Sequence, residues 1–436
     1  MERYNEYKDS GVQWLGEIPS HWDLKHLRNF LTIFSEKGHG DKQLLSVTRE
    51  KGVILRDKDN KEENHNFVPD DLSGYKHLCA GDFVINKMKS WQGSYGVSEY
   101  EGIVSPAYFT CKLRGVDPKF FSRAIRSKAY IGFFMQYSKG IRVDQWDLDP
   151  NSMKDIPFVL PTLPEQQAIA DYLDTATAKI DEAIAQQQKM INLLNERKQI
   201  IINNAVTKGL NPDAPMKDSG VDWIGEIPEH WEINKFRNLF KTRTGITFTK
   251  AQLEEEGEPV ISYGQIHSKE NWGASVNPVL IRHIPASLTK GKESALAFKG
   301  DFLFADTSED FEGCGNCVCI DTPEPIYAGY HTILAKRDND EHEQYLAYLF
   351  ASSNWRGQLR SMVNGVKVYS VTQSLLKAVI VLLPPKSEQI EIAEYITKRV
   401  VLIDAAIKRH TDRIKLLQER KQIIINDVVT GKVKVS

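Results

Sequence analysis

Residues 8–30 read KDSGVQWLGEIPSHWDLKHLRNF, and residues 217–239 read KDSGVDWIGEIPEHWEINKFRNL, with 14 of 23 positions identical at a constant offset of 209. A second pair of matched stretches follows. LLNERKQIIIN at 193–203 returns as LLQERKQIIIN at 416–426, with 10 of 11 residues identical at an offset of 223. The sequence between the matched pieces is hardly alike. The chain therefore repeats a constant frame around two different inserts, and the second insert is 14 residues longer than the first.

A chain of 436 residues is long enough for two to four domains, each of which can bury a core. The frame divides this chain into four parts. Residues 1–157 hold the first frame motif and the first insert, and residues 158–209 hold a first long helix. Residues 210–380 hold a polar, turn-rich linker, the second frame motif and the second insert. Residues 381–436 hold a second long helix.

The two long helices carry the strongest secondary-structure signal. No Gly or Pro interrupts the chain after the prolines that open residues 164–206 and 385–429. Proline in the first turn is typical of a helix start. Gly209 and Gly431 lie just beyond the last turns and predict C-terminal stops.

Apolar residues recur along both helices at alternating spacings of three and four, which is the pattern of a coiled-coil seam. The predicted seam consists of Ile180, Ile184, Ile191, Leu194 and Ile201 in the first helix, and of Ile403, Ile407, Ile414, Leu417 and Ile424 in the second. Because both helices carry the same seam in the same register, we expect them to pair with each other. The predicted fold is α+β, with two globular domains separated by two long antiparallel coiled-coil helices and pseudo-twofold internal symmetry.

Composition and charge exclude several classes of protein. Hydrophobic residues make up 41% and charged residues 26% of the chain, an ordinary balance for a globular protein. No run of 18 apolar residues and no N-terminal apolar signal segment occurs, so we expect no membrane partner and a cytoplasmic location. A net charge of −2 argues against a wholly electrostatic nucleic-acid binder but leaves room for a local basic face.

Motifs that would indicate catalysis are missing from the sequence. It has no phosphate-binding loop, Rossmann fingerprint, nucleophile elbow or H-E-x-x-H pair. It also lacks the Asp/Asn-Pro-Pro-aromatic tetrad of amino-methyltransferases. We therefore predict a non-catalytic protein with no catalytic residues. A nuclease site assembled from scattered carboxylates stays a separate hypothesis, which cleavage of DNA by the purified chain with Mg²⁺ would reveal.

Three of the five cysteines, Cys314, Cys317 and Cys319, cluster in GCGNCVC. They could contribute to a zinc site, with His283 or His331 as a fourth ligand, but nothing repeats the C-x2-C spacing. The alternative is a short strand whose cysteines are small buried residues. We favour the second interpretation and predict no metal site.

The first insert contains a basic segment with the side chains that DNA recognition needs. Residues 82–142 hold 10 Lys or Arg against 4 Asp or Glu. Such a patch suits phosphates, and neighbouring polar and aromatic groups suit base edges. Two loops carry the candidate DNA-binding residues: Lys87, Lys89, Trp91, Gln92, Ser94, Tyr95, Lys139, Arg142, Asp144 and Gln145.

The second insert has a parallel layout with different reading residues. GDFLFADTSED at 300–310 corresponds to GDFVINKMKS at 81–90, and NGVKVYSVT at 364–372 corresponds to KGIRVDQWD at 139–147. This insert is not visibly basic, and its loop at 306–312 is acidic, which argues against DNA binding. The candidate DNA-binding residues here are Tyr263, Gln265, His267, Lys290, Lys292, Thr307, Ser308, Lys367, Tyr369 and Ser370.

The repeated W-(L/I)-G-E-I-P-x-H-W motifs, the two Pro-rich segments ending in Glu-Gln, and the paired ERKQIIIN helix ends resemble the specificity subunit of type I restriction–modification enzymes. The resemblance covers essentially the whole chain. GDFVINKMKSWQGSYGVSEYEGIVSPAY at 81–108 is similar to one common class of target-recognition domains in that family.

The resemblance implies that the inserts are two target-recognition domains, each reading half of a bipartite, asymmetric site in double-stranded DNA. It implies that the helices fix the unread spacer and dock two methyltransferase subunits, with ATP-dependent restriction subunits joining in the full phage-defence complex. S-adenosylmethionine, ATP and magnesium would belong to those partners, and no cofactor to this chain. The implied partner-binding residues are Glu196, Arg197, Glu419 and Arg420.

A second class of function fits the repeat and the near-neutral charge equally well. A coiled-coil scaffold that presents two protein-binding domains, without contact to DNA, would also keep its frame and vary its inserts. Salt-dependent binding of duplex DNA in the presence of a methyltransferase partner separates these two hypotheses.

Overall fold

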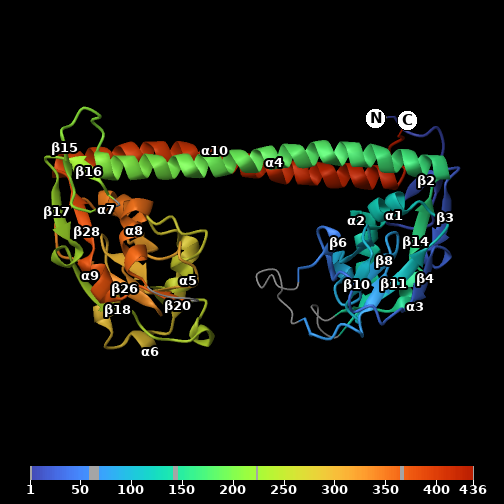
Figure 1. The fold of residues 1–436 in the computed structure, drawn as a ribbon, viewed down its shortest axis with the longest axis horizontal. Coiled ribbons are helices and arrows are strands. Elements are labelled where there is room, and N and C mark those ends of the chain that lie inside the picture. The colour runs from blue at the N-terminus through green and yellow to red at the C-terminus, as the bar shows by residue number, and fades with distance from the viewer. Residues whose placement is uncertain (1, 58–67, 141–145, 222–223, 364–367, 436) are drawn as a thin grey trace. The chain divides into compact units, whose positions relative to one another are not determined.

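A computed structural model describes residues 2–57, 68–140, 146–221, 224–363 and 368–435. The chain divides into two compact units (Figure 1). The first unit comprises Met1–Gln188 with Thr411–Ser436, and the second comprises Lys189–His410. Both boundaries fall inside the long helices. Each unit therefore contains one frame motif, one insert and a part of each helix.

The repeated frame motifs fold in the same way in both units. In the first unit, β1 (Tyr7–Asp9) pairs with β2 (Glu17–Pro19), and β3 (Asp23–His26), which leads into the 3-10 turn η1 (Leu27–Asn29), pairs with β14 (Pro157–Leu160). In the second unit, β15 (Met216–Asp218) pairs with β16 (Glu226–Pro228), and β17 (Glu232–Lys235), which leads into η4 (Phe236–Asn238), pairs with β28 (Ile380–Leu383). All four pairs are antiparallel.

The two inserts share a central sheet although their sequences differ. The first sheet has the order β4 (Leu31–Phe34), β11 (Tyr108–Leu113), β8 (Phe83–Asn86), β9 (Tyr95–Val97). The second has the order β18 (Phe240–Thr244), β26 (Thr332–Arg337), β22 (Phe302–Ala305), β24 (Cys317–Cys319). Every pair in both sheets is antiparallel. The predicted correspondence of the two GDF segments is confirmed, because β8 and β22 hold the same place.

The residues before β8 and β22 explain why GDF is repeated. Gly81 and Gly300 have φ of 91° and 88°, a backbone region that favours glycine. The next side chain closes the turn. Asp82 Oδ2 accepts from the Cys79 amide at 2.9 Å, and Asp301 Oδ2 accepts from the Phe298 amide at 2.9 Å.

The remaining strands distinguish the inserts. The first insert adds the antiparallel pairs β5 (Leu45–Thr48) with β6 (Gly52–Leu55) and β7 (Lys76–Leu78) with β10 (Gly102–Val104). The second insert adds a four-stranded sheet of β20 (Arg282–Ile284), β19 (Glu258–Ile261), β25 (Ile326–Ala328) and β21 (Leu296–Ala297). Around this sheet lie η5 (Lys250–Gln252), α5 (Tyr263–Ile266), η6 (Pro278–Leu280), α6 (Ala286–Thr289) and η7 (Glu293–Ala295).

Three helices follow the central sheet in each insert. They are α1 (Pro118–Ile125), α2 (Lys128–Gln136) and α3 (Pro150–Lys154) in the first unit, and α7 (Glu343–Ala351), α8 (Ser353–Met362) and α9 (Gln373–Ala378) in the second. Side chains cap the first turn of all of them except α2, as in α1, where the Asp117 carboxylate accepts from the Phe120 amide at 2.8 Å.

The two long helices are α4 (Leu163–Lys208) and α10 (Lys386–Val429), close to the predicted bounds. Gly209 and Gly431 have φ of 72° and 76° and end them as predicted. The helices lie side by side (Figure 1) and carry the predicted seam, of which Ile191 and Ile403 are 9% and 8% exposed. The other seam residues are half-buried.

Two ion pairs fix the antiparallel register of the helices. In the first unit, Lys421 Nζ lies 2.6 Å from Asp181 Oδ2, and in the second, Lys198 Nζ lies 2.9 Å from Asp404 Oδ1. Asp181 and Lys198 of α4 occupy the repeat positions of Asp404 and Lys421 of α10. The same contact is therefore made twice, once in each unit.

The frame motif and the following helix are tied by one glutamate in each unit. Glu165 Oε1 accepts from His21 Nε2 at 2.8 Å and from the Trp22 indole at 3.3 Å. In the second unit, Glu388 Oε2 lies 2.7 Å from His230 Nε2 and accepts from the Trp231 indole at 3.2 Å. These contacts give a physical reason for the repeated His-Trp and Glu-Gln pairs.

The following glutamine ties the insert to the same helix. Gln166 Oε1 accepts from the Asp117 amide at 2.8 Å, while its amide group donates to the Pro161 carbonyl at 2.9 Å. Gln389 makes the equivalent contacts with the His342 amide and the Pro384 carbonyl, both at 2.9 Å. Both glutamines are buried.

The ends of the helices close the opposite unit from the one in which they begin. Asn426, near the end of α10, accepts from the Ala129 amide at 3.3 Å and so holds the start of α2 in the first unit. Asn203, near the end of α4, donates to Ser353 Oγ at 2.7 Å at the start of α8 in the second unit. The paired ERKQIIIN segments are thus joined to the same feature of each insert.

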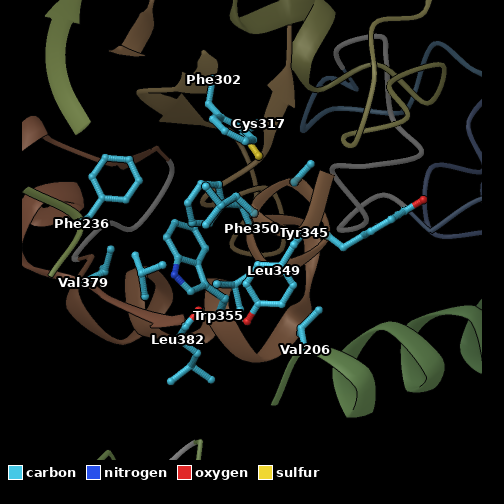
Figure 2. Packing of buried hydrophobic residues seen from close by; sticks show 14 of the residues in the cluster. Val206, Phe236, Phe302, Cys317, Tyr345, Leu349, Phe350, Trp355, Val379 and Leu382 are labelled. Atoms are coloured by element: carbon cyan, nitrogen blue, oxygen red, sulfur yellow. Dashed lines mark hydrogen bonds between the residues drawn. The ribbon is translucent and has the colours of Figure 1, made fainter. Parts of the chain in front are cut away.

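Each unit buries its own core. In the second unit, Phe236, Phe350 and Trp355 pack between the central sheet, α7 and α8 (Figure 2). Val206 of α4 and Leu382 of β28 belong to the same core. Among helices of the described residues, none is both long and apolar enough to cross a bilayer.

The cysteine cluster belongs to this core. Cys317 points into it (Figure 2), and Cys314, Cys317 and Cys319 are 1%, 4% and 1% exposed. Burial raises the pKa of the Cys317 thiol to about 12 and the pKa of the other two thiols as well. Within the described residues, neither His283 nor His331 joins them in a group of potential metal ligands. Cys317 and Cys319 are buried residues of β24, and Cys314 is buried in the turn before it.

Candidate nucleic-acid interface

In the first unit, the two loops predicted to read DNA lie against each other. The loop after β8 contains η2 (Ser90–Gln92), and the second loop is framed by β12 (Ser138–Lys139) paired with β13 (Asp147–Leu148). Lys87 Nζ donates to Asp147 Oδ2 at 2.9 Å, and the rings of Trp91 and Trp146 lie 5.5 Å apart. Sequence segments some 50 residues apart thus form one surface.

The surface presents cations beside half-buried rings. Lys89 and Lys139 are exposed, Met88 is 52% exposed, and Trp91 keeps part of its ring accessible. The Lys87 charge is already paired with Asp147, which leaves Lys89 and Lys139 as the stronger candidates for phosphate contacts. Of the other predicted residues, Gln92 is half-buried, whereas Arg142, Asp144 and Gln145 lie outside the described residues.

Two predicted DNA-binding residues of this loop are wrong. Ser94 is 3% exposed and Tyr95 is fully buried. The Tyr95 ring stacks on Phe134 at 4.1 Å because β9 turns that side chain toward the helices. Burial raises the pKa of Tyr95 far above its usual value. In the described part of the chain its hydroxyl has no hydrogen-bond partner.

In the second unit, β23 (Thr307–Ser308) pairs antiparallel with β27 (Tyr369–Ser370) and joins two of the predicted loops. Ser370 is exposed and Tyr369 is half-buried. The Tyr369 ring meets the exposed ring of Phe311 at 5.5 Å, edge to face. The first unit joins its two loops differently, because β12 and β13 both belong to the second loop, and the Lys87–Asp147 and Trp91–Trp146 contacts hold that loop against the first.

A polar cluster beside β23 centres on Asp306. Its Oδ1 accepts from Thr307 Oγ1 at 2.7 Å and lies 2.9 Å from His331 Nδ1. Tyr263 and Tyr330 flank the His331 ring, with centroids at 5.5 and 4.0 Å. Tyr330 is 39% exposed, so the cluster reaches the surface.

His331 is held in an unusual conformation. Its φ is 54°, and within the described residues it is the one non-glycine residue with positive φ. Such backbone conformations cost about 1–3 kcal/mol and are concentrated at functional sites. With Nδ1 bound to Asp306, the ring presents Nε2 as its second polar atom. Sequence reasoning considered His331 only as a possible zinc ligand, because a left-handed histidine leaves no pattern in the sequence.

Three other predicted residues of this unit have their polar atoms engaged inside the protein. His267 Nε2 donates to the Thr307 carbonyl at 2.8 Å, and its Nδ1 accepts from Asn316 at 3.0 Å. Gln265 Oε1 accepts from the Ser262 amide at 3.1 Å. Ser308 is 3% exposed and donates to the Asp310 carbonyl at 2.6 Å. The expectation that Ser308 contacts DNA is wrong, and His267 and Gln265 support the loops.

The acidic loop carries less free charge than its sequence suggests. Arg356 and Arg360 both donate to the Glu312 carbonyl, and Arg360 also lies 3.0 Å from the Glu312 carboxylate. Lys290 and Lys292 are exposed at the end of α6 and the start of η7, and no described contact joins them to the Asp306 cluster. Lys367 lies outside the described residues.

The predicted partner-binding residues Glu196, Arg197, Glu419 and Arg420 are all exposed. The structure adds apolar neighbours that the sequence analysis did not single out. Leu193 and Ile200 of α4 are 48% and 51% exposed, and their repeat positions Leu416 and Ile423 of α10 are 65% and 57% exposed. A seven-residue spacing places each pair on one helix face, outside the seam.

Comparisons with known proteins bear on both halves of the chain. A family model described as "Type I restriction modification DNA specificity domain" matches residues 228–416. The chain is 25% identical to the putative type I restriction enzyme MjaX specificity subunit of Methanocaldococcus jannaschii, over 97% of this chain and 96% of that protein. It is 21% identical to the type I restriction enzyme EcoKI specificity subunit of Escherichia coli, over 95% and 90%.

A solved structure shows the same fold. It comes from work on complex assembly and conformational transition of the type I R-M system, and it matches with a TM-score of 0.65. The match covers 95% of this chain and 99% of the solved chain at 14% identity.

Proposed function

We propose that this chain, which belongs to the specificity subunits of type I restriction–modification systems, reads a bipartite, asymmetric site in double-stranded DNA, one half-site with each compact unit. DNA target recognition is the shared role of that family. The division of the work between the two units is what the proposal adds.

One observation carries this proposal. The frame and the central sheet order are the same in both units, and in each unit the same two loops lie against each other, whereas the side chains on those loops differ. The first unit offers lysines with Trp91 and Trp146, and the second offers Asp306, His331 and tyrosines. A constant support with different hydrogen-bonding groups is what two separate base sequences require.

The roles of the exposed groups follow from their chemistry. Lys89 and Lys139 would contact phosphates, because a lysine is a flexible point charge. His331 would contact a base edge, since Asp306 fixes its ring and leaves Nε2 to meet a donor or an acceptor. Tyr263 and Tyr330 would restrict how a base approaches that nitrogen.

The helices would dock two methyltransferase subunits. The repeated apolar pairs Leu193 with Ile200 and Leu416 with Ile423 would form the buried centre of each contact. Glu196, Arg197, Glu419 and Arg420 lie beside these pairs in sequence and would form the polar rim. Two copies of the same surface suit two copies of one partner.

Cofactors and catalysis would belong to the partners. The chain is a non-catalytic subunit in this proposal, with S-adenosylmethionine on the methyltransferase subunits and ATP and magnesium on restriction subunits of the full complex. Its own contribution is to select the site at which those subunits act.

The half-site assignment is tested by methylation of a randomised DNA library with the assembled methyltransferase complex. His331→Ala should relax base preference in one half-site and Trp91→Ala in the other, each leaving the remaining half-site unchanged. Tyr100→Ala, which removes an exposed ring beyond β9, is the matched control. A variant that changes both half-sites equally, or neither, contradicts the assignment.

The spacer is tested by lengthening both helices together. Seven residues inserted after Gln188 and seven after Arg413 preserve the 3.5-residue repeat and leave the Asp181–Lys421 and Lys198–Asp404 pairs intact. The added rise is about 10 Å, so the unread spacer should grow by about three base pairs with both half-sites unchanged. An unchanged spacer would mean that the helices do not set it.

The competing hypothesis is a coiled-coil scaffold that presents two protein-binding domains and does not contact DNA. It predicts that affinity of the assembled complex for duplex DNA does not fall with rising salt, whereas contacts to several phosphates predict a steep fall. The basic loop pair of the first unit favours DNA.

A further inference from the structure

The first insert contains a cluster of two histidines and a glutamate that the DNA-reading surface does not use. Glu36 and His39 follow β4, and His77 lies in β7. Glu36 Oε1 lies 2.9 Å from His39 Nε2 and 3.2 Å from His77 Nδ1. In the described residues this is the one group of three such side chains whose ligand atoms all lie within 4.8 Å of one another.

These distances are close to those of a metal site. With Zn–N and Zn–O bonds of about 2.0–2.1 Å, neighbouring ligands of a tetrahedral zinc ion lie about 3.3 Å apart. Two imidazole nitrogens and one carboxylate oxygen form a ligand set that suits zinc. His39 and Glu36 are accessible from solvent, while His77 is buried, so an ion would have both an anchor and a path of access.

The second nitrogen of His77 adds an independent observation. His77 Nε2 lies 3.3 Å from the Glu101 carboxylate, and Lys42 Nζ holds that carboxylate at 2.8 Å. A histidine that binds a metal almost always donates its other ring N–H to a carboxylate or carbonyl, which fixes the tautomer and the ring orientation. Here Glu101 would leave Nδ1 of His77 as the lone-pair nitrogen, on the side of Glu36.

The two imidazole rings lie on the same side of the cluster. The rings of His39 and His77 are stacked, with centroids 4.3 Å apart and an interplanar angle of 28°, and a nitrogen of each ring lies beside Glu36 Oε1.

We propose that Glu36, His39 and His77 form a zinc site in the first insert, with Glu101 orienting His77 from behind and a water completing the tetrahedron. The ion would join the segment after β4 to strand β7, where an isolated backbone bridge already pairs Glu36 with His77. The site stands independently of DNA recognition.

The test is a titration of the full chain, freed of metal, with ZnCl2 at pH 7.5. The Cys79→Ser background removes an exposed thiol that lies two residues from His77. One equivalent of Zn²⁺ should bind, and Co²⁺ in its place should give the visible absorption of a tetrahedral site. His39→Gln should weaken Zn²⁺ binding at least tenfold, and since that side chain is partly exposed the variant should still fold. Glu101→Gln, which changes only the partner of His77 Nε2 and leaves the three ligand side chains in place, should weaken binding about 10–100-fold.

His26→Gln, an exposed histidine on β3, is the matched control and should bind like the parent protein. The proposal is overturned if the parent chain binds no Zn²⁺ beyond a His39→Gln, His77→Gln double variant. If Glu101→Gln binds as tightly as the parent, Glu101 does not orient His77, and that part of the proposal is overturned. Each measurement reads metal binding directly and is independent of methylation.

Discussion

Replacing Glu165 by glutamine should loosen the start of α4 in the first unit. The Glu165 carboxylate accepts four hydrogen bonds, from His21, the Trp22 indole, and the amide and hydroxyl of Thr162 at 3.1 and 2.8 Å. Glutamine keeps one acceptor oxygen and replaces the other by a donor. At least one partner then faces an N–H group, and the others lose a charged acceptor.

The size of the effect follows from the partners. A hydrogen bond to a charged group contributes about 1.5–3 kcal/mol when shielded and far less when exposed. The bond from the Trp22 indole is partly buried and contributes most, whereas the bonds from His21 and Thr162 are exposed and each add a smaller amount. We expect the free energy of local opening at the start of α4 to fall by about 2 kcal/mol, which corresponds to roughly 30-fold faster hydrogen exchange there.

Hydrogen exchange measured by mass spectrometry on peptides from the start of α4 reads this opening directly. Glu388→Gln is the internal comparison, because Glu388 accepts two such bonds and a proline, Pro385, stands at the repeat position of Thr162. Glu388→Gln should lower the free energy of local opening at the start of α10 by about half as much. Glu17→Gln, an exposed residue of β2, controls for the loss of one charge.

Acid should remove the difference between Glu165 and its glutamine variant. Burial raises the pKa of Glu165, but the hydrogen bonds from His21, Thr162 and Trp22 outweigh it, and the net pKa is lowered. A lowered pKa in the folded state stabilises the protein above the unfolded pKa, and that stabilisation disappears as pH falls through the folded pKa. Equal exchange at neutral pH in Glu165→Gln and Glu17→Gln would refute the reasoning.

Three further outcomes are expected. Lys198→Glu should lower the melting temperature slightly, because an exposed ion pair contributes about 0.2–1 kcal/mol. Adding Asp404→Lys to that variant should restore the melting temperature, and lack of rescue would show that the pair is not formed. Tyr95→Phe should leave DNA affinity unchanged and hold or raise stability, by up to about 1 kcal/mol, because it removes a buried hydroxyl without a partner; weaker DNA binding at equal stability would contradict its burial. Cys317 should resist a maleimide at pH 8 in the folded chain, since burial raises the pKa of its thiol to about 12, whereas the exposed Cys79 should react; equal labelling rates of both would disprove this.

The sequence predicted the long helices well because their signals are local. Proline and glycine set the ends, and the spacing of isoleucines along each helix set the face that pairs. The pairing of the two helices needed only the observation that both seams share one register. The two ion pairs of Lys198 and Lys421, which fix that pairing as antiparallel, were not part of the sequence prediction.

The errors in the candidate site have a common physical cause. Whether a loop residue points outward depends on the strand that follows it, and Tyr95 begins β9 with its ring toward Phe134. Ser308 is also buried, because its hydroxyl donates to the Asp310 carbonyl. His331 and the Glu36–His77 contact were not predictable, because their partners lie 25 and 41 residues away and depend on the packing of the inserts.

The position of Asn426 has a consequence for the order in which the protein is made. The second unit is one continuous stretch, Lys189–His410, and can fold once that stretch has left the ribosome. The first unit also needs Thr411–Ser436, whose Ile425 and Val428 belong to its core and whose Asn426 holds the start of α2. The insert that is synthesised first is therefore completed after the second one, because part of its core comes from residues 411–436.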